Sequence, residues 1–377
     1  MRRPSNPRQA QAMQREKSNI STSGRFNSIH NRRSPMRPHA RRFAPSIGAA
    51  TALLLLTTGC ATSSSPSPSE TSGASETSGY PVTLENCGRE ITVEAEPERI
   101  VSLWQSTTEA LLALGLRDQI VAVQEAYAPY PDSVAAEAEG LTSVGSQMGF
   151  PSKEVLLSQQ PDFVTGQVLE GFAFDASQGY ASVQQLEQAG ATVYGANLCT
   201  MTDNQSIDTW NIDTVSQTLR DYGTIFNVSA KADEVIADLE ADREKVVSAV
   251  EGAPIVKTAY FNGGTGPVIV LAGGIYDDLI TTAGGENVFP SDATFVSKEE
   301  FAAADADVIL VGTFPGQDFA AQKAFLEENF PDHPAVKNGR ISEVPTQETD
   351  SSISVMVGLT KIANALHPDL GLPVPTS

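Results

Sequence analysis

The stretch of residues 230–250 reads AKADEVIADLEADREKVVSAV. Its apolar side chains recur at roughly helical spacing between charged residues, at Val235, Ile236, Leu239, Val246 and Val247. No Gly or Pro interrupts the run before Gly252. The pattern predicts one long helix, which ends a predominantly helical region that begins near residue 207.

Short apolar runs alternate with helical stretches on both sides of this helix. The strand-like runs lie at 100–103, 120–123, 163–164 and 192–194 before it, and at 255–261, 268–271, 308–311 and 340–344 after it. Such alternation predicts mainly parallel sheets with helices on their faces. We therefore predict an α/β chain with two Rossmann-like lobes joined by one long α-helix. A strand pair around Asn86-Cys87-Gly88 precedes the first lobe.

The chain begins with features of an exported lipoprotein. A basic run at 36–42 precedes an apolar run at 49–58, which is too short to span a membrane core of about 30 Å. The residues TTGC at 57–60 resemble a bacterial lipobox, although Thr57 stands where that pattern prefers Leu. Cys60 would then carry a lipid that holds the protein on the outer face of the cytoplasmic membrane. An ordinary secretory signal is the alternative.

The segments around this signal lack a folding pattern. Residues 1–35 are basic and polar, and they are either an extended leader or lie upstream of a true start at Met36. Residues 61–79 are almost entirely Ser, Thr, Pro, Gly, Ala and Glu, which suits a flexible tether. We expect an extension and signal peptide over 1–59, a tether over 60–79, lobes over 80–206 and 253–377, and a helical linker over 207–252.

Charge is distributed unevenly along the chain. Eleven of the 25 Lys and Arg residues lie at or before Arg42, whereas only one of the 46 acidic residues, Glu16, does. Beyond Cys60, the chain therefore contains 14 basic and 45 acidic residues. Such a surface repels phosphate backbones, so nucleic acid is excluded as a partner. A strongly anionic ligand would also need a local cluster of Arg.

Two cysteines remain after Cys60, namely Cys87 and Cys199. Disulfides persist outside the cytoplasm, so an exported chain favours a structural Cys87–Cys199 bridge. Two isolated buried thiols are the alternative. No CxxC pattern or neighbouring His suggests redox or metal chemistry.

A near-repeat links the two halves of the chain. SKEVL at 152–156 runs on to PDFV at 161–164, and SKEEF at 297–301 runs on to ADVI at 306–309. Ser is a favoured N-cap, which places Glu154 and Glu299 in the first turns of equivalent helices. An acid there complements the helix dipole, and this alone would explain either residue. The two glutamates match in position, with one in each lobe, and this favours a shared role in contacting a two-fold symmetric partner.

The sequence resembles the substrate-binding proteins of ABC importers for ferric siderophores, haem and cobalamin. The resemblance runs from about Val82 to the C-terminus, through PERIVSL at 97–103, TEALLALG at 108–115, the repeat above, AGGENVF at 283–289 and NGRI at 338–341. It implies a rigid bridging helix, a ligand cleft between the lobes and only modest closure on binding. It also implies that Glu154 and Glu299 dock on an ABC permease dimer, which works with its ATPase, while the binding protein itself is a monomer.

Aromatic residues just after predicted strands are the candidates for the cleft, because open α/β sheets place ligands at the carboxyl ends of strands. Each of them is equally well explained as a core residue. Large faces with hydroxyl tips suit a bulky, partly apolar chelate. The candidates are Trp104, Tyr127, Tyr130, Phe150, Phe172, Phe174, Tyr260, Tyr276 and Phe314.

Two further residues receive structural interpretations. Ser106-Thr107-Thr108-Glu109 fits a capping box, in which Glu109 reaches back to the amide of the N-cap residue. Trp210 is expected to pack against the linking helix.

Absences narrow the ligand class. The sequence has four His, at 30, 39, 333 and 367, and a site for bare zinc or manganese needs a cluster of His and carboxylates. The candidate cleft segments contain almost no Arg, which favours a neutral or cationic ferric hydroxamate over a catecholate, with cobalamin or haem as alternatives. This iron complex would be cargo, not a cofactor. No GxSxG, HExxH or GxxxxGK[ST] motif points to an enzyme.

Overall fold

The computed structural model describes residues 79–147, 149–201 and 209–376. These residues belong to one compact unit, Gly73–Ser377. The expected extension, signal peptide and lipidated Cys60, and the expected tether apart from Gly79, lie outside the described residues.

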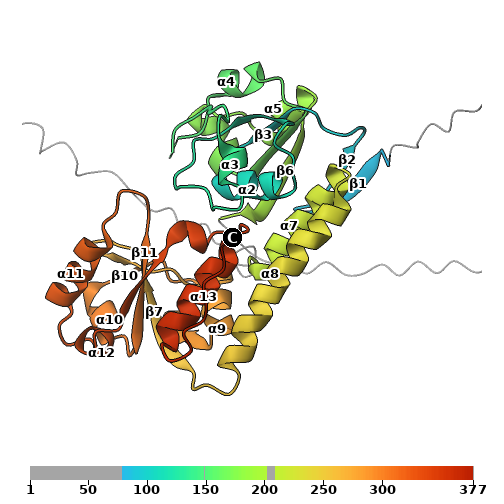
Figure 1. Ribbon diagram of the computed structural model, residues 1–377. Coiled ribbons are helices and arrows are strands. Elements are labelled where there is room, and N and C mark those ends of the chain that lie inside the picture. The colour runs from blue at the N-terminus through green and yellow to red at the C-terminus, as the bar shows by residue number, and fades with distance from the viewer. Residues whose placement is uncertain (1–78, 148, 202–208, 377) are drawn as a thin grey trace, which may run out of the picture. The chain divides into compact units, whose positions relative to one another are not determined.

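A four-stranded parallel sheet organises the first half of the described chain, called here the N-terminal lobe (Figure 1). Its strands run in the order β4-β3-β5-β6. Their bounds are Ile120–Val123 for β4, Ile100–Ser102 for β3, Phe163–Glu170 for β5 and Thr192–Thr200 for β6. Helices α2 (Gln105–Ala113), α3 (Ala135–Ala138), α4 (Lys153–Ser158) and α5 (Val183–Gln188) lie in the connections, as parallel strands require.

A second four-stranded parallel sheet, in the order β12-β11-β7-β9, organises the C-terminal lobe. The bounds are Ile341–Pro345 for β12, Val308–Thr313 for β11, Val256–Phe261 for β7 and Gly285–Asn287 for β9. All six residues of β11, VILVGT, are buried, which is typical of a central strand covered on both faces. Each lobe thus has its own parallel sheet with helices in the connections between strands. This confirms the predicted α/β class with parallel sheets.

The remaining elements of the C-terminal lobe are helices and one short strand pair. β8 (Val268–Ile269) pairs with β10 (Phe295–Val296) in antiparallel fashion. The helices are α9 (Gly274–Thr282), α10 (Lys298–Ala303), α11 (Phe319–Asn329), α12 (Pro334–Lys337) and α13 (Val355–Leu366). The structure also contains three short 3₁₀ turns: η1 (Phe172–Phe174) and η2 (Ala176–Gln178) in the N-terminal lobe, and η3 (Thr346–Glu348) in the C-terminal lobe.

An antiparallel hairpin of β1 (Val82–Asn86) and β2 (Arg89–Val93) precedes the first sheet. Its turn residues Cys87 and Gly88 have φ of 55° and 69°, the left-handed pair that a two-residue type I′ turn requires. A disulfide joins Cys87 to Cys199, with the two Cα atoms 5.2 Å apart. The Asn86 side chain also exchanges two hydrogen bonds of 2.9 Å with the backbone of Gly195. The hairpin is thereby fastened to β6.

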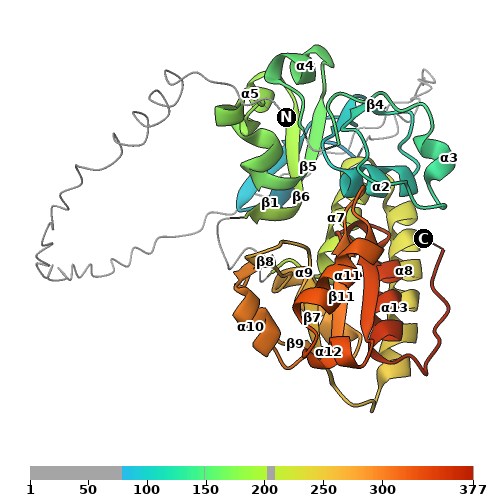
Figure 2. The same cartoon turned by 90° about the vertical axis from the view of Figure 1, so that its left-hand side faces the viewer.

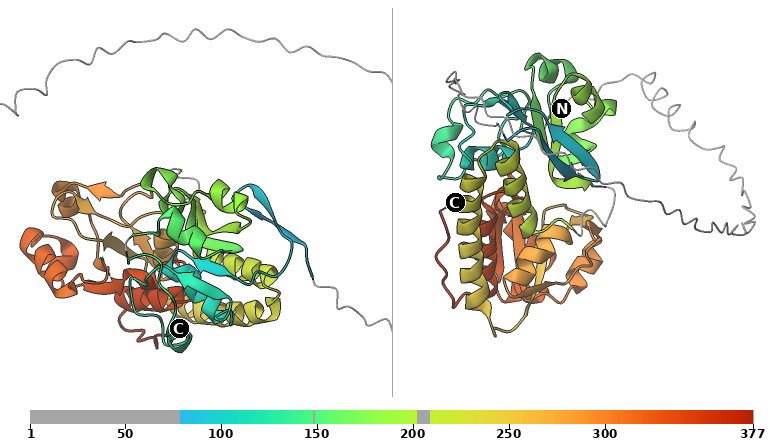
Figure 3. Two further views of the ribbon diagram at one scale, coloured as in Figure 1. Left: turned by 90° about the horizontal axis from the view of Figure 1, so that it is seen from above. Right: turned by 90° about the vertical axis from the view of Figure 1, so that its right-hand side faces the viewer.

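Two helices connect the lobes, α7 (Ile212–Ile225) and α8 (Ser229–Val250). The 22-residue α8 starts one residue before the helix predicted at 230–250 and ends with it. The helical region breaks between them, where Asn227 has φ of 54°. α7 contacts β6 and α9, whereas α8 packs along α7 (Figure 3) and beside α13 (Figure 2).

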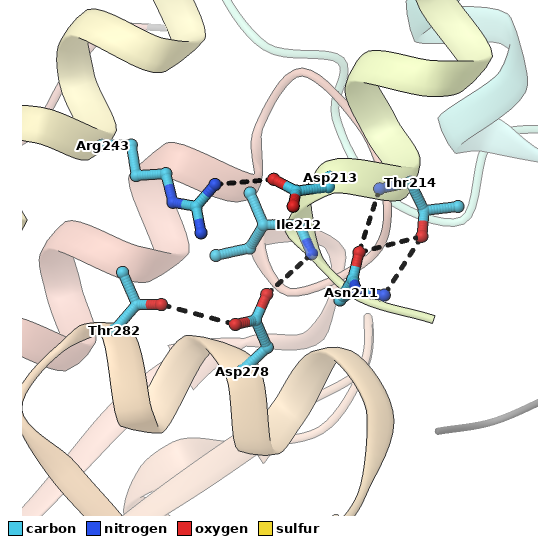
Figure 4. Close-up of polar contacts among 7 residues, drawn as sticks. All are labelled: Asn211, Ile212, Asp213, Thr214, Arg243, Asp278 and Thr282. Atoms are coloured by element: carbon cyan, nitrogen blue, oxygen red, sulfur yellow. Dashed lines mark hydrogen bonds and ion pairs between the residues drawn. The ribbon is translucent and has the colours of Figure 1, made fainter. Parts of the chain in front are cut away.

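Polar contacts fasten the start of α7 to the C-terminal lobe (Figure 4). The Ile212 backbone N–H donates to the Asp278 carboxylate of α9 at 2.8 Å. Asp213 pairs with Arg243 of α8 at 2.6 Å. Asn211 and Thr214 form a capping box. Because α7 also contacts β6, this helix couples the two sheets.

Candidate ligand-binding site

A cluster of aromatic rings follows the strands of the N-terminal lobe. The Trp104 ring lies 5.3 Å from Tyr127, 6.2 Å from Phe150 and 5.2 Å from Phe172, measured between centroids. Phe150 and Phe172 lie 4.9 Å apart in an edge-to-face arrangement. We call Trp104, Tyr127, Phe150, Phe172 and Phe314 the aromatic cluster. Rings at these separations attract one another beyond simple burial.

Phe314 reaches this cluster from the C-terminal lobe. It follows β11, and its ring lies 6.5 Å from that of Tyr127. Phe172 is 37% exposed and has φ of 53°, a conformation that bulky residues rarely adopt. Strained residues of this kind persist where the surrounding structure holds them, often at binding sites. The aromatic cluster therefore contains residues of both lobes and one strained, exposed ring.

A carboxylate from the C-terminal lobe lies against these rings. One oxygen of Asp350 accepts hydrogen bonds from Trp104 Nε1 at 2.6 Å and from the Tyr127 hydroxyl at 3.0 Å. The other accepts from Gln167 Nε2 at 2.7 Å and from the Ser351 backbone N–H at 2.8 Å. Asp350 is only 7% exposed, and this burial raises the pKa of its carboxyl group although the four donors oppose the shift. The site is thus acidic and closed by direct contacts between the lobes.

The segment that carries Asp350 runs from η3 to the start of α13. It reads TDSSIS over 349–354, and all six residues are buried. Its polar groups have partners just before α7 and in the N-terminal lobe: Trp210 Nε1 donates to Ser351 Oγ, and Ser354 Oγ donates to Glu109 at 3.4 Å. The backbone of Glu348, which precedes this segment, lies very close to Gly358 of α13. A Cβ atom at Gly358 would overlap the carbonyl oxygen of Glu348, so this close packing requires a glycine.

Glu109 is a second buried carboxylate at this interface. It accepts hydrogen bonds from Gln105 Nε2 at 3.0 Å and from Ser354. Burial raises the pKa of Glu109 to about 7, and the negative charge of Asp350 adds to the shift. The capping box predicted for Ser106 and Glu109 is wrong, because α2 begins at Gln105 and Trp104 occupies its N-cap position without a side-chain bond.

The predicted cleft aromatics separate into groups. Trp104, Tyr127, Phe150, Phe172 and Phe314 meet in the aromatic cluster. Tyr130 is half-buried against the core of the lobes, and burial raises its pKa to about 12. Tyr276 packs against Trp210 and Tyr260 at 5.6 and 5.8 Å, near enough to Asp350 for that charge to raise its pKa.

Two of the nine candidates lie in the cores of their lobes instead of the cleft. Tyr260 is the fifth residue of β7, and its fully buried hydroxyl lies 3.4 Å from the Val344 carbonyl and from Thr349 Oγ1. Phe174 follows β5, but η1 turns it back onto Gly166, where a Cβ atom would lie 3.1 Å from its ring. These two assignments are corrected: Tyr260 lies inside its strand, and Phe174 lies over a glycine of its own sheet.

Sequence reasoning missed the polar half of the site. Asp350, Gln167 and Ser351 were not among the candidates, and Trp210 was expected to pack against the linking helix. Asp350 follows β12 just as the aromatics follow their strands. The rule about carboxyl ends of strands would have found it, had it been applied to polar residues as well.

The repeated glutamates occupy matching positions in the two lobes. Ser152 caps α4 and Ser297 caps α10, each accepting a backbone N–H of the first turn. Glu154 and Glu299 are exposed in those first turns. Hydrogen bonds from its own backbone and from Ser152 hold the pKa of Glu154 below its usual value, so it is ionised at neutral pH.

Other features of the described residues lie away from this site. An open groove of about 480 Å³ lies between β2 and the start of β6 and is lined by five acidic residues, Glu90, Glu94, Glu96, Asp162 and Glu187. Across residues 79–376, apart from the undescribed gaps, no group of three or more His, Cys, Asp or Glu is arranged to hold a metal ion. Within the same residues, no helix has the length and apolarity of a membrane span.

The chain is similar to known proteins in both sequence and structure. Residues 100–348 match a family model described as periplasmic binding protein. An uncharacterized ABC transporter substrate-binding lipoprotein of Bacillus subtilis is 24% identical over 84% of this chain and 96% of its own length. A vitamin B12-binding protein of Vibrio campbellii is 31% identical over 51% of this chain, and the match spans 61% of that relative. The structure of an ABC-type Fe³⁺-hydroxamate transport system from Saccharomonospora viridis superposes with a TM-score of 0.62 at 25% identity, covering 76% of this chain and 99% of that one.

Proposed function

The chain belongs to the periplasmic binding protein family, and from this premise we propose that it captures a ferric siderophore of the hydroxamate type and delivers it to an ABC permease. It is an ABC-type substrate-binding protein of the class that serves iron chelates, vitamin B12 and haem, and it is not an enzyme.

The observation that carries the proposal is an aromatic cluster around a buried carboxylate. The described partners of Asp350 and Glu109 are all uncharged side chains or backbone groups. Aromatic faces suit the apolar shell of a bulky chelate. A tris-catecholate complex carries several negative charges, and Asp350 would repel it. A ferric hydroxamate is neutral or cationic and meets no such penalty.

The named relatives support this choice and one alternative. The Saccharomonospora viridis structure is described as part of a hydroxamate transport system. Cobalamin is the second candidate, because a vitamin B12-binding protein shares 31% identity over half of this chain. Cobalamin is also bulky and carries no strong negative charge in most forms, so the same site would accept it.

We place the protein on the outer face of the cytoplasmic membrane, anchored through a lipid on Cys60. The signal-like sequence before Cys60 supports this placement, and the Bacillus subtilis relative is named a lipoprotein. We assign permease docking to Glu154 and Glu299, because each is exposed in the first turn of a Ser-capped helix in its own lobe. A two-fold permease would present two equivalent basic sites to them.

The experiment that tests the ligand class is calorimetric titration of the purified protein. The panel contains ferrioxamine B, a ferric tris-catecholate, haem and cyanocobalamin, with the iron-free hydroxamate as control. We expect the ferric hydroxamate to bind at least about 100-fold more tightly than the catecholate, a difference of about 3 kcal/mol. Binding of cyanocobalamin alone would transfer the assignment to cobalamin. Failure of every member to bind would remove the chelate proposal.

A further inference from the structure

The Asp350 carboxylate is a buried negative charge whose recorded partners are all neutral. Trp104, Tyr127 and Gln167 donate from the N-terminal lobe, and the Ser351 backbone donates from its own segment. Buried charges in proteins are usually paired with an opposite charge, because hydrogen bonds from neutral groups replace only part of the lost hydration. The site therefore lacks a counter-charge that a ligand can supply.

The basic residues nearest to Asp350 in the sequence are engaged elsewhere. Arg340 donates two hydrogen bonds of 2.8 Å to the carbonyl groups of Ala365 and Leu366. Lys361 pairs with Glu348 at 2.6 Å. Both side chains are engaged by these partners, so the protein does not provide the counter-charge from these positions.

The rings around Asp350 point to the same kind of ligand by a separate argument. Trp104 and Tyr127 bind the carboxylate directly, and Phe150, Phe172 and Phe314 extend the cluster outward. Aromatic faces attract cations, Trp most strongly, when the charge lies within about 6 Å of the ring centroid. A carboxylate among aromatic rings is a combination that favours organic cations over neutral or anionic groups.

We propose that Asp350 and the aromatic cluster bind a positively charged ammonium group of the ligand. The inference rests on the proposed function and narrows it to chelates that carry a free amine or a comparable cation. The ammonium N–H takes the place of the Gln167 amide, because Gln167 is the half-buried donor of the four bonds, whereas Trp104 and Tyr127 are buried. Exchange of an amide for a cation keeps the hydrogen bond and adds charge attraction.

A matched pair of probes isolates this charge. Ferrioxamine B carries one free ammonium group, and N-acetylation of that amine gives a chelate of nearly the same size without the charge. We expect calorimetry to show ferrioxamine B binding at least about tenfold more tightly than its acetylated form. Pentylamine serves as a third probe, since its ammonium group carries the charge and the N–H donors without any chelate.

The variant Asp350→Asn tests whether this carboxylate is responsible. We expect the ratio between the two affinities to fall to within about twofold, whereas Asp369→Asn, which removes an exposed charge of the same lobe, keeps the wild-type ratio. Circular dichroism melting establishes whether Asp350→Asn folds; if it does not, the wild-type ratio decides the question.

The outcomes separate this inference from the proposed function. Equal affinity of the wild-type protein for both chelates would overturn the ammonium site and leave the siderophore proposal intact. A ratio that Asp350→Asn does not change would also overturn it. Binding of pentylamine without either chelate would retain the cation site and remove the siderophore proposal. No binding of any probe would overturn both.

Discussion

The indole N–H of Trp104 donates a 2.6 Å hydrogen bond to Asp350, a residue 246 positions further along the chain and in the other lobe. The same carboxylate oxygen accepts the Tyr127 hydroxyl. Both contacts are polar, so a ligand or water can replace them when the lobes separate, and each donor is then satisfied again. A cation bound between Asp350 and the Trp104 ring would change the surroundings of the indole, which makes Trp104 a reporter of binding.

Ligand binding is expected to quench the fluorescence of Trp104. The sequence contains two Trp residues, and Trp210 contacts Ser351 and Tyr276, whereas Trp104 belongs to the aromatic cluster. We expect titration with ferrioxamine B to quench the wild-type protein and Trp210→Phe, whereas Trp104→Phe loses most of the signal. Quenching that survives in Trp104→Phe and disappears in Trp210→Phe would place the ligand elsewhere.

Stability is expected to fall as the pH rises from about 4.5 to about 7, because of Glu109. The folded protein holds the proton of Glu109 up to about pH 7, whereas an unfolded chain releases it near its ordinary pKa of 4.5. In this window the folded state binds more protons, so raising the pH lowers the free energy of unfolding, by up to about 3 kcal/mol for a shift of this size. The raised pKa of Asp350 acts in the same direction.

The variant Glu109→Gln tests this pH dependence directly. Glu109 faces Gln105, Ser354 and the charge of Asp350, so the amide removes one titrating group and keeps its shape. Denaturant unfolding at pH 5, 6, 7 and 8 should show a shallower decline than in the wild-type protein, with Glu137→Gln, an exposed change, keeping the wild-type slope. An unchanged slope in Glu109→Gln would show that another group causes the decline.

Local patterns were sufficient to predict several elements of this fold. The helix predicted at 230–250 is found as α8, Ser229–Val250, because its apolar spacing and the absence of Gly and Pro are local properties. Ser152 and Ser297 cap their helices for the same reason. The hairpin turn at Cys87 and Gly88 also follows from nearby residues alone.

Long-range contacts were not predictable in this way. Nothing near Trp104 in the sequence indicates Asp350 as its partner, so only the fold reveals the acidic half of the site. Glu109 shows the converse: its sequence fits a local capping box, yet burial against Ser354 of the other lobe determines where its carboxylate lies. Tyr260 was misplaced although the predicted run 255–261 ends with β7 at Phe261, because a side chain inside a strand can point into the core instead of towards the cleft.

Replacement of Gly358 by Ala is expected to disrupt the segment that carries Asp350. The new methyl group would overlap the Glu348 carbonyl oxygen and lie 3.2 Å from Thr349 Cγ2, so η3 must move away from α13. Substitutions that force the backbone apart in a packed region lower the free energy of unfolding by about 1–3 kcal/mol or more. We expect a lower melting temperature and weaker ligand binding together. Gly79→Ala, where the same atom meets nothing within 4 Å, is the control; equal melting of the two variants would contradict the packing argument.

Loss of the two repeated glutamates is expected to lower uptake without lowering ligand affinity. Glu154 and Glu299 lie exposed in the first turns of α4 and α10, on the lobes' surfaces and apart from the buried Asp350 site. Truncation of paired charges at an interface typically costs about 2–5 kcal/mol, so the double change Glu154→Ala and Glu299→Ala should reduce uptake of radioactive iron chelate by cells at least about tenfold.

The matched control for this experiment is Glu137→Ala with Glu328→Ala, which removes one exposed acid from each lobe and leaves the same net charge. We expect the control cells to transport normally and all the proteins to bind the chelate equally in calorimetry. A fall in ligand affinity in the Glu154 and Glu299 variant would assign these residues to binding instead of docking. Equal losses of uptake in both double variants would indicate a general effect of surface charge, since specific docking depends on position and charge together.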